Sequence, residues 1–392
     1  MLTPPTLAAL RTPAGTEVLR RAAELGTGDD RVLATTTALR AAGHSPELVA
    51  AAVGTVRLRA RAAAKFGADA DAMFFTPDGV EQATRASVAA HRAERFAGIA
   101  RVADLCCGIG GDLVALARAG VSVTGVDADP LTAAVAAANA EVLGLTDRVA
   151  VRCADVTTLD LRGVDAAFCD PARRSGGRRV FDPSAYSPSW DFLMSLVATV
   201  PRVGLKVAPG IDHARLPPGV EAEWVSDGGD VKEAALWCGD LASGTPRRAT
   251  LLPSGATLTG TGTALSPVGP VQEWLYDPDG AVVRAHLVAE LAASLGATGI
   301  DPTIAYLTSG RLIPTPFARA YRVDEVMPFS LKRLRAALRA RGVGRAEIKK
   351  RGSAVDVETL RRDLRLAGDG EATVVLTRVG AKPTVLLCTA VR

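Results

Sequence analysis

The sequence predicts an α/β protein built on a parallel sheet with covering helices. Three observations carry this prediction. From residue 102 to about 243, short apolar runs alternate with helical patterns, as strand–helix–strand units require. Several of these runs end in an aspartate, and a glycine-rich turn follows the first of them. Outside this region the rhythm changes, to helical patterns before residue 99 and to a compact helix-and-strand pattern after residue 325.

We divide the chain into four segments on this basis. Residues 1–98 are expected to be helical, 99–243 to hold the sheet, 244–325 to form a mixed connecting region, and 326–392 to form a small α+β domain. EAEWVSD and VKEAALWCGD are expected to close the sheet as a terminal antiparallel pair. The connecting region shows one clear helix, AVVRAHLVAELAASL (281–295). In the last segment, Leu331, Leu334 and Leu338 share one helix face, and ATVVLTRV and PTVLLCTAV are expected to be strands.

Composition excludes several classes of protein. No apolar run reaches the length of about 18 residues that a membrane-spanning helix needs, so no membrane partner is expected. The six cysteines show no paired spacing, which favours reduced thiols in a cytoplasmic protein. No CxxC or Cys/His cluster indicates a metal. The sequence gives no sign of the oligomeric state.

Positive charge gathers near the C-terminus. The whole chain has a net charge of +4, whereas residues 329–351, FSLKRLRAALRARGVGRAEIKKR, hold nine basic residues and one acid. Such a cluster favours a polyanion as partner, although a solvated helix face is the alternative. A second basic face is expected at Arg57, Arg61 and Lys65, which share one side of a helix.

The strongest chemical signal is VADLCCGIGGDLVALARAG (102–120). A strand ending in Asp104 leads into Gly108-Ile109-Gly110-Gly111 and then a helix. Glycines allow a tight turn and close approach of a ligand, and the helix N-terminus offers free N–H groups. A dinucleotide fingerprint would carry glycine at position 113, which is leucine, and Asp104 would repel a pyrophosphate. S-adenosylmethionine is therefore favoured over a dinucleotide, with a turn that binds nothing as the remaining alternative.

Acids recur at the ends of the next strands. Asp127 ends VTGVD, where it is placed to accept ribose hydroxyls, and Asp155 ends VRCAD, where it could receive an adenine amino group. Asp170 ends VDAAFCD and begins DPARRSGGRR, a loop with Gly176 and Gly177 among arginines. Ligands of such sheets bind at the carboxyl ends of the strands, so acids in this series indicate a site.

VADLCCGIGGD, VTGVDADP, VRCAD and FCDPAR resemble the ordered motifs of class I S-adenosylmethionine-dependent methyltransferases, in the branch that modifies nitrogen atoms of RNA bases. MFFTPDGVEQAT (73–84) and LGLTDRVAV (143–151) are similar to stretches of trimethylguanosine synthase, and the C-terminal segment looks like a THUMP-like domain. The resemblance implies a Rossmann-like class I methyltransferase sheet and cofactor contacts from Thr76, Asp104, Gly108, Gly110, Gly111, Asp127 and Asp155. By the same resemblance Phe75 would lie beside the methionine end, unless it is a core residue.

The resemblance also implies a role for Asp170. In amino-methylating members, the fourth strand ends in an acid or amide, which is followed by Pro-Pro and an aromatic residue. This acid or amide aligns the target amino group with the methyl group. Asp170 and Pro171 are kept here, but Ala172 and Arg173 replace the second proline and the aromatic residue. Asp170 would orient the amino group or act as a general base, and Arg173 would stack on a base or bind phosphate. The catalytic candidates are Asp170, Pro171 and Arg173.

DPARRSG also resembles the motif of RNA uracil C5-methyltransferases. These enzymes need a cysteine after the next strand, where RVGLKVAPGIDHA has none, so a covalent carbon-methylating mechanism is disfavoured. Tyr186 and Trp190 could stack on a base or belong to the core, and His213 is more typical of a surface or packing residue.

The predicted function is methylation of a base nitrogen in tRNA or rRNA with S-adenosyl-L-methionine. The alternatives are a methyltransferase for a small molecule or protein, and a catalytically silent RNA-binding protein. RNA is the expected partner, and its candidate contacts are the basic residues of two segments: Arg174, Arg178, Arg179, Lys332, Arg333, Arg335, Lys349, Lys350 and Arg351.

Overall fold

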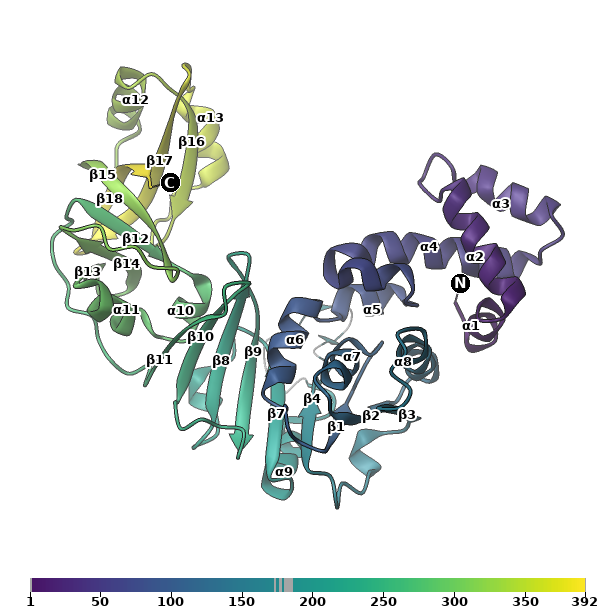
Figure 1. Cartoon of the computed structure of the whole chain (residues 1–392). Helices are drawn as coiled ribbons and strands as arrows, with labels where there is room; N and C mark the ends of the chain where they lie inside the picture. Colours follow the sequence, from purple (N-terminus) through teal and green to yellow (C-terminus); the bar gives the residue numbers. More distant parts are fainter. Residues whose placement is uncertain (1, 173, 176–177, 180–185, 392) are drawn as a thin grey trace. The chain divides into compact units, whose positions relative to one another are not determined.

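The computed structural model describes residues 2–172, 174–175, 178–179 and 186–391 (Figure 1). Arg173 lies outside the described residues, and residues 174, 175, 178 and 179 are described by their backbone alone. The chain forms two compact units. The first comprises Met1–Val220 and Ala234–Ser243, and the second Glu221–Glu233 and Gly244–Arg392.

The first unit begins with helices, as expected from the sequence. Proline at the first helical turn and a hydroxyl N-cap start four of them, with Thr3, Thr12, Ser45 and Thr76 accepting backbone N–H groups. The first three helices contact the long α4, and α1 also contacts α8 of the sheet region. The elements are α1 (Pro4–Leu10), α2 (Pro13–Leu25), α3 (Val32–Ala41), α4 (Pro46–Phe66), η1 (Gly67–Asp71), α5 (Pro77–Gln82) and α6 (Ala86–Glu94).

A mainly parallel sheet follows in the same unit. Its strands run in the order β3-β2-β1-β4-β7-β9, and only β9 is antiparallel to its neighbour. The order reverses between β1 and β4, which is the place where ligands of such sheets bind. The strands are β1 (Arg101–Leu105), β2 (Ser122–Asp127), β3 (Val149–Cys153), β4 (Ala166–Cys169), β7 (Arg202–Val207) and β9 (Asp230–Gly239), whose first four residues belong to the second unit.

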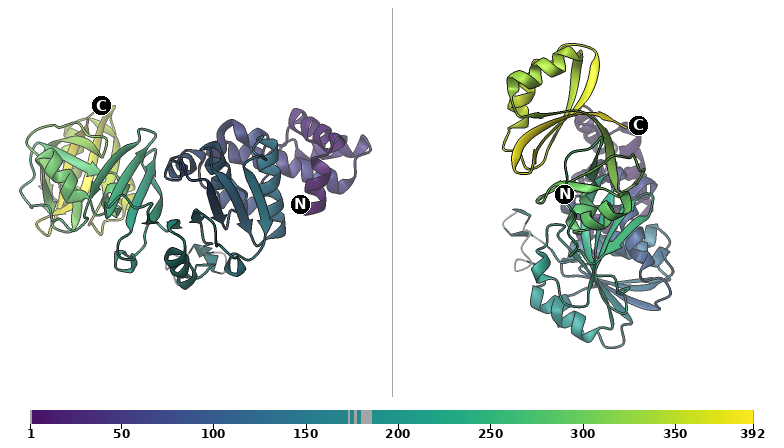
Figure 2. Two further views of the ribbon diagram at one scale, coloured as in Figure 1. Left: turned by 60° about the horizontal axis from the view of Figure 1, so that its bottom comes forward. Right: turned by 90° about the vertical axis from the view of Figure 1, so that its left-hand side faces the viewer.

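Helices cover both faces of this sheet (Figure 2). The helices α6, α7 (Gly111–Arg118) and α8 (Pro130–Val142) share a core with Phe168 of β4 and Trp237 of β9, while α9 (Trp190–Thr199) contacts β7. Two short 3-10 turns, η2 (Val156–Thr158) and η4 (His213–Arg215), follow β3 and β7. A small hairpin of β5 (Arg174–Ser175) and β6 (Arg178–Arg179) follows β4. The predicted α/β fold with a parallel sheet is confirmed.

The second unit holds more strands than the sequence patterns revealed. A parallel pair of β8 (Glu221–Asp227) and β10 (Arg247–Leu252) is extended by β11 (Ala256–Gly260). A seven-stranded sheet has the order β13-β14-β12-β15-β18-β17-β16. Its strands are β12 (Trp274–Pro278), β13 (Thr298–Asp301), β14 (Ile304–Ser309), β15 (Ala318–Pro328), β16 (Val343–Lys350), β17 (Gly370–Val379) and β18 (Lys382–Ala390).

The C-terminal helices lie on one face of this sheet. Leu334 and Leu338 of α12 (Leu331–Ala340) and Leu360 of α13 (Val357–Leu364) share a core with Val374 and Leu387. Their strand neighbours Val375 and Leu386 belong to a different core, with Tyr306 and Tyr321, because successive strand residues face opposite sides. The predicted α+β character of this region is confirmed.

Two predictions about this unit are wrong. The single helix expected over 281–295 is two helices, α10 (Gly280–Arg284) and α11 (Val288–Leu295), because His286 takes a left-handed backbone angle (φ 61°) that ends the first. β8 is not a terminal strand, because β10 pairs with it along its length. Among the described helices, none is long and apolar enough to cross a membrane.

Candidate active site

The acids at the strand ends gather at one edge of the sheet. Leu105 of β1 is in register with Val126 of β2 and with Cys169 of β4, so these three parallel strands end side by side. Asp104, Asp127 and Asp170 therefore come from three neighbouring strands. Asp155 follows β3, at the outer end of the same edge. Parallel strands bring together residues that are far apart in the sequence.

The glycine loop joins β1 to α7 in a backbone shape that requires glycine. Gly108 (φ 57°) and Gly110 (φ 90°) take left-handed angles, and Gly110 is the N-cap of α7. Cys106 takes a similar angle (φ 62°). The loop is anchored to β2, because the N–H of Cys107 donates to the carbonyl of Val126 at 3.0 Å. The loop thus presents backbone and a helix N-terminus at the strand edge.

Asp104 is a buried acid without a hydrogen-bond partner among the described residues. Its exposed fraction is 0%, and neither carboxylate oxygen is bonded. Burial raises the pKa of Asp104 well above its usual range, and the nearby Asp112 and Asp170 raise it further, against the opposing effect of Arg92. An unpaired buried carboxylate is costly, and a cationic ligand would remove that cost. An ammonium group therefore fits this position.

A buried ion pair under the loop explains why Arg92 does not bond Asp104. Arg92 of α6 is 2% exposed and binds Asp112 in the first turn of α7. Its guanidinium also lies 4.6 Å from the centre of the Phe168 ring. The pair holds α6 against the helix that begins at the glycine loop. The sequence analysis did not single out Arg92. Its position on the apolar face of residues 86–96 could have marked it, because an arginine there needs a buried partner.

Asp127 and Asp155 use their carboxylates locally. Asp127 accepts the N–H of Gly108 through Oδ2 and the N–H of Asp129 through Oδ1, each at 3.0 Å. Asp155 is exposed and caps η2, accepting the N–H of Thr157 at 2.9 Å and its hydroxyl at 2.8 Å through Oδ1. These hydrogen bonds lower the pKa of Asp155. Both carboxylates are therefore held in one orientation.

The segment before α5 is fastened to the glycine loop by Asn139. This fully buried side chain of α8 accepts the N–H of Phe74 at 2.7 Å, and it donates to the carbonyls of Phe74 (3.0 Å) and Ile109 (2.9 Å). Thr76 follows and caps α5, accepting the N–H of Gly79 at 3.0 Å. Asn139 was also missed, although a lone amide in the alanine-rich TAAVAAANAEV is a visible signal.

Phe75 is a core residue. It is fully buried, and its ring centre lies 5.3 Å from that of Phe66. Tyr186 is buried too, accepts the N–H of Ala208 at 3.0 Å and contacts the ring of Trp190 at 6.3 Å. Packing accounts for Phe75 and Tyr186. His213 is half-buried in η4.

Asp170 is held by a lysine that the sequence analysis did not single out. The Nζ atom of Lys206, on β7, lies 2.5 Å from Oδ2 of Asp170 and donates also to the hydroxyl of Thr84 at 2.8 Å. The N–H of Asp170 donates to the carbonyl of Leu105 at 3.3 Å. Pro171 is buried, and Ala172 then pairs with Ser187 through two backbone hydrogen bonds.

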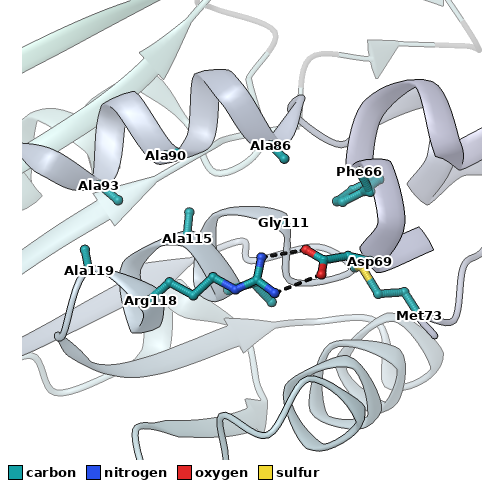
Figure 3. A pocket seen from close by; sticks show the side chains of 11 residues that line it. Phe66, Asp69, Met73, Ala86, Ala90, Ala93, Gly111, Ala115, Arg118 and Ala119 are labelled. Atoms are coloured by element: carbon teal, nitrogen blue, oxygen red, sulfur yellow. Dashed lines mark hydrogen bonds and ion pairs between the residues drawn. The ribbon is translucent and has the colours of Figure 1, made fainter. Parts of the chain in front are cut away.

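A cavity near the loop is separate from the acids. A cavity of about 260 Å³ lies between α6, α7 and η1, lined mainly by apolar side chains such as Phe66 and Met73 (Figure 3). At its side, Arg118 makes a two-armed ion pair with Asp69, with N–O distances of 2.5 and 2.9 Å. Of the site residues, Gly111 alone lines it, so the cavity is no alternative site for the chemistry.

Comparison with known proteins decides the family. A protein of Mycobacterium tuberculosis, described as an uncharacterised S-adenosylmethionine-dependent methyltransferase, is 42% identical over 339 residues, which cover 84% of this chain and 92% of that protein; the figures are the same for strains H37Rv and CDC 1551. The chain belongs to the S-adenosylmethionine-dependent methyltransferases. The expected enzyme class and cofactor are thereby confirmed.

Three family models match parts of this methyltransferase. A model described as RNA cap guanine-N2 methyltransferase matches residues 99–182, one described as THUMP domain-like matches 318–390, and one of unknown function matches 3–62. A crystal structure of a candidate methyltransferase from Porphyromonas gingivalis W83 has the same fold, with a TM-score of 0.78 and 22% identity, covering 96% of this chain and 99% of that one. The recognised methyltransferase and THUMP-like regions are confirmed.

The basic residues of the methyltransferase's second unit fall into two groups. Lys332, Arg333 and Lys350 are exposed. Lys349 instead bonds Asp277 at 2.9 Å, and Arg351 lies 3.4 Å from the same carboxylate. Burial opposes the charge of Lys349, but the bond to Asp277 still raises its pKa. Arg335 donates to the backbone carbonyl of Asp363. Among the described residues, no group of three or more His, Cys, Asp or Glu is arranged to hold a metal.

Proposed function

We propose that this methyltransferase methylates a base nitrogen of RNA, in tRNA or rRNA. The observation that carries the proposal is Asp170, a carboxylate at the end of β4 that is oriented by Lys206 beside the unpaired Asp104. The matches to an RNA cap guanine-N2 methyltransferase model and to a THUMP-like model support RNA as the substrate.

The proposed cofactor site follows from the geometry of the strand edge. Asp104 would accept hydrogen bonds from the ammonium group at the methionine end of the cofactor. Among the hydrogen-bond donors of the cofactor, this group alone carries a positive charge, so it suits the two buried oxygens of Asp104. Gly108, Gly110 and Gly111 would let the cofactor lie against backbone, Asp127 would accept ribose hydroxyls, and Asp155 the adenine amino group. Thr76 would line the methionine end from α5.

The proposed chemistry needs positioning more than acid strength. When bound, S-adenosylmethionine supplies an electrophilic methyl group: the nitrogen lone pair forms the N–C bond, sulfur keeps the C–S electron pair, and the nitrogen then releases a proton to water. Asp170 would accept a hydrogen bond from the target amino group and so aim its lone pair. Pro171 would direct the chain away from the site, and Arg173 is proposed to contact the base or its phosphate.

RNA is proposed to contact basic residues of both units, which in the second unit are exposed. In the second unit these are Lys332, Arg333 and Lys350, with phosphate as the group they recognise. Arg174, Arg178 and Arg179 follow β4 closely and would contact RNA near the target base. Lys349 and Arg351 are occupied by Asp277, and Arg335 by a carbonyl, so their main contribution is to hold the second unit together.

The test is an assay of Asp170→Ala with RNA from cells that lack the protein. We expect transfer of labelled methyl groups to fall by about a thousandfold, while calorimetry shows cofactor affinity within about threefold of wild type. Asp129→Ala, which removes an exposed helix cap beyond β2, is the matched control and should keep its activity. Mass spectrometry of the nucleosides identifies the base. Transfer to the protein or metabolite fraction instead of RNA would overturn the proposal.

A further inference from the structure

Lys206 is an unusual residue for its position. It lies on β7, between β4 and β9, in the apolar stretch Val203–Ala208. Its side chain is 6% exposed, yet it carries an ammonium group. A buried lysine in a central strand loses its hydration, which lowers the stability of the fold relative to an apolar residue. The acid that pairs with it must also lose part of its hydration. Local departures of this kind are expected where function requires them.

The ammonium of Lys206 connects three segments at the site. It bonds Asp170 Oδ2 at 2.5 Å, at the end of β4, and Thr84 Oγ1 at 2.8 Å, in the turn between α5 and α6. Thr84 is itself buried, with 8% of its surface exposed. The bond to Thr84 restricts the position of the Lys206 ammonium, and the ammonium in turn restricts the rotation of the Asp170 carboxylate. The nitrogen of Lys206 is therefore held from two sides.

The pair leaves Asp170 with one engaged and one unengaged oxygen. Oδ2 accepts from Lys206, whereas Oδ1 has no hydrogen-bond partner among the residues that the structure describes. The side chain of Asp170 is 24% exposed, so the carboxylate can be reached from solvent. An acid with one oxygen fixed cannot rotate freely about its terminal bond. Its second oxygen then points in one direction, which is what alignment of an amino group requires.

We propose that Lys206 is a positioning residue for methyl transfer, which orients Asp170 so that Oδ1 receives the target amino group. This rests on the proposed role of Asp170. Lys206 acts through Asp170 and does not touch the methyl group. Thr84 fixes the ammonium, so the turn before α6 also contributes to the alignment. The function of the pair is orientation, and its loss should affect turnover rather than the binding of either substrate.

Two substitutions of Lys206 separate orientation from packing. Lys206→Met keeps the length of the side chain and removes the charge and its hydrogen bonds. We expect its kcat to fall by about 50-fold, with the cofactor Kd and the KM for RNA within about threefold of wild type. Lys206→Arg keeps a donor for Asp170 and should recover kcat to within about tenfold of wild type. A fall in cofactor affinity equal to the fall in kcat, with no recovery in the arginine variant, would overturn the inference.

A double-mutant comparison keeps the test decisive if Lys206→Met folds poorly. In the Asp170→Asn background, the Lys206→Met change leaves no carboxylate at position 170 without its partner. In this background the Lys206→Met change should lower kcat by less than about threefold, because the carboxylate that Lys206 orients is already replaced by an amide. Equal effects of Lys206→Met in both backgrounds would contradict positioning. Full activity of Asp170→Ala on RNA would refute the proposed role of Asp170, and transfer to protein or metabolites instead of RNA would refute the proposed function. An inactive Asp170→Ala with a fully active Lys206→Met would refute the role of Lys206 alone.

Discussion

The strand edge of the first unit and the basic segment of the second unit use charge in opposite ways. At the strand edge, Asp104 is completely buried and has no hydrogen-bond partner among the described residues. In the basic segment, Lys349, Arg351 and Arg341 are paired with acids of the same unit. The first region therefore keeps an acid without a partner, whereas the second region pairs several of the basic residues that make its sequence look strongly positive.

The difference teaches how charge in a sequence should be interpreted. A buried charge without a partner has a large cost, so a protein keeps one where a ligand supplies the partner. A cluster of basic residues has no such constraint, because neighbouring acids can neutralise it in the fold. The nine basic residues in 329–351 therefore overstate the positive surface that is available to a polyanion.

Among the tests of this comparison, the largest expected effect is on cofactor binding. Replacing Asp104 by asparagine removes the negative charge that we propose for the ammonium group, so the affinity for S-adenosylmethionine should fall by about 100-fold. Calorimetry of the cofactor with the purified protein measures this. Asp129→Asn, at the exposed cap of α8, is the control and should stay within about twofold. Wild-type affinity in Asp104→Asn would show that the unpaired carboxylate is not the ammonium site.

The next effect is on the stability of the second unit. Lys349→Met leaves Asp277, whose side chain is 16% exposed, with the longer contact to Arg351 alone. The free energy of unfolding should fall by about 2 kcal/mol, measured by denaturant titration. The neighbouring Lys350 is exposed, so Lys350→Met should change it by less than about 0.5 kcal/mol. Equal losses in the two variants would mean that the bond to Asp277 adds nothing.

A smaller effect is expected on RNA affinity. Lys332, Arg333 and Arg339 of α12 are exposed, and none of them forms an ion pair within the described part of the chain. Replacing the three by alanine should weaken RNA binding about tenfold at 0.1 M salt. It should also lower, by about two, the steepness with which the logarithm of the binding constant falls against the logarithm of the salt concentration. Filter binding over a salt series measures both. Unchanged thermal unfolding is the control, and an unchanged slope would remove α12 from the proposed RNA surface.

The smallest effect concerns pH. The pKa of Asp104 is raised in the cofactor-free protein by burial and by Asp112 and Asp170, against Arg92. Its contribution to stability is therefore fully present below the pKa of the unfolded chain, and it is lost as pH rises through the higher folded value. Between pH 5 and pH 8, wild type should therefore lose more of its free energy of unfolding than Asp104→Asn loses. Parallel stability curves for the two proteins would contradict this assignment.

The sequence predicted much of the fold and of the site for a simple reason. Parallel strands place their carboxyl ends together, so the aspartates that end successive apolar runs had to meet. The glycine loop was equally visible, because Gly108 and Gly110 take backbone angles that other residues avoid. The break at His286 was not visible, because histidine has no strong local preference against a helix and its left-handed angle is set by the surrounding fold.

The partners of these residues were beyond the sequence. Arg92, Asn139 and Lys206 each appear as a polar residue in an apolar pattern, which marks them as unusual without naming what they bind. Lys206 is 36 residues from Asp170 and 122 from Thr84, and Asn139 is 65 from Phe74. Only the folded chain brings these pairs within hydrogen-bond distance.

The sequence by itself determined that acids and glycines would line one edge of a parallel sheet, because local patterns set the strands and topology sets their ends. The tertiary structure decided which charges remain available. Asp104 stays unpaired, Asp170 is oriented by Lys206, and Lys349 is neutralised by Asp277. The physical reason is that a charge is matched by whatever lies within a few ångströms, and that distance depends on the packing of elements distant in the chain.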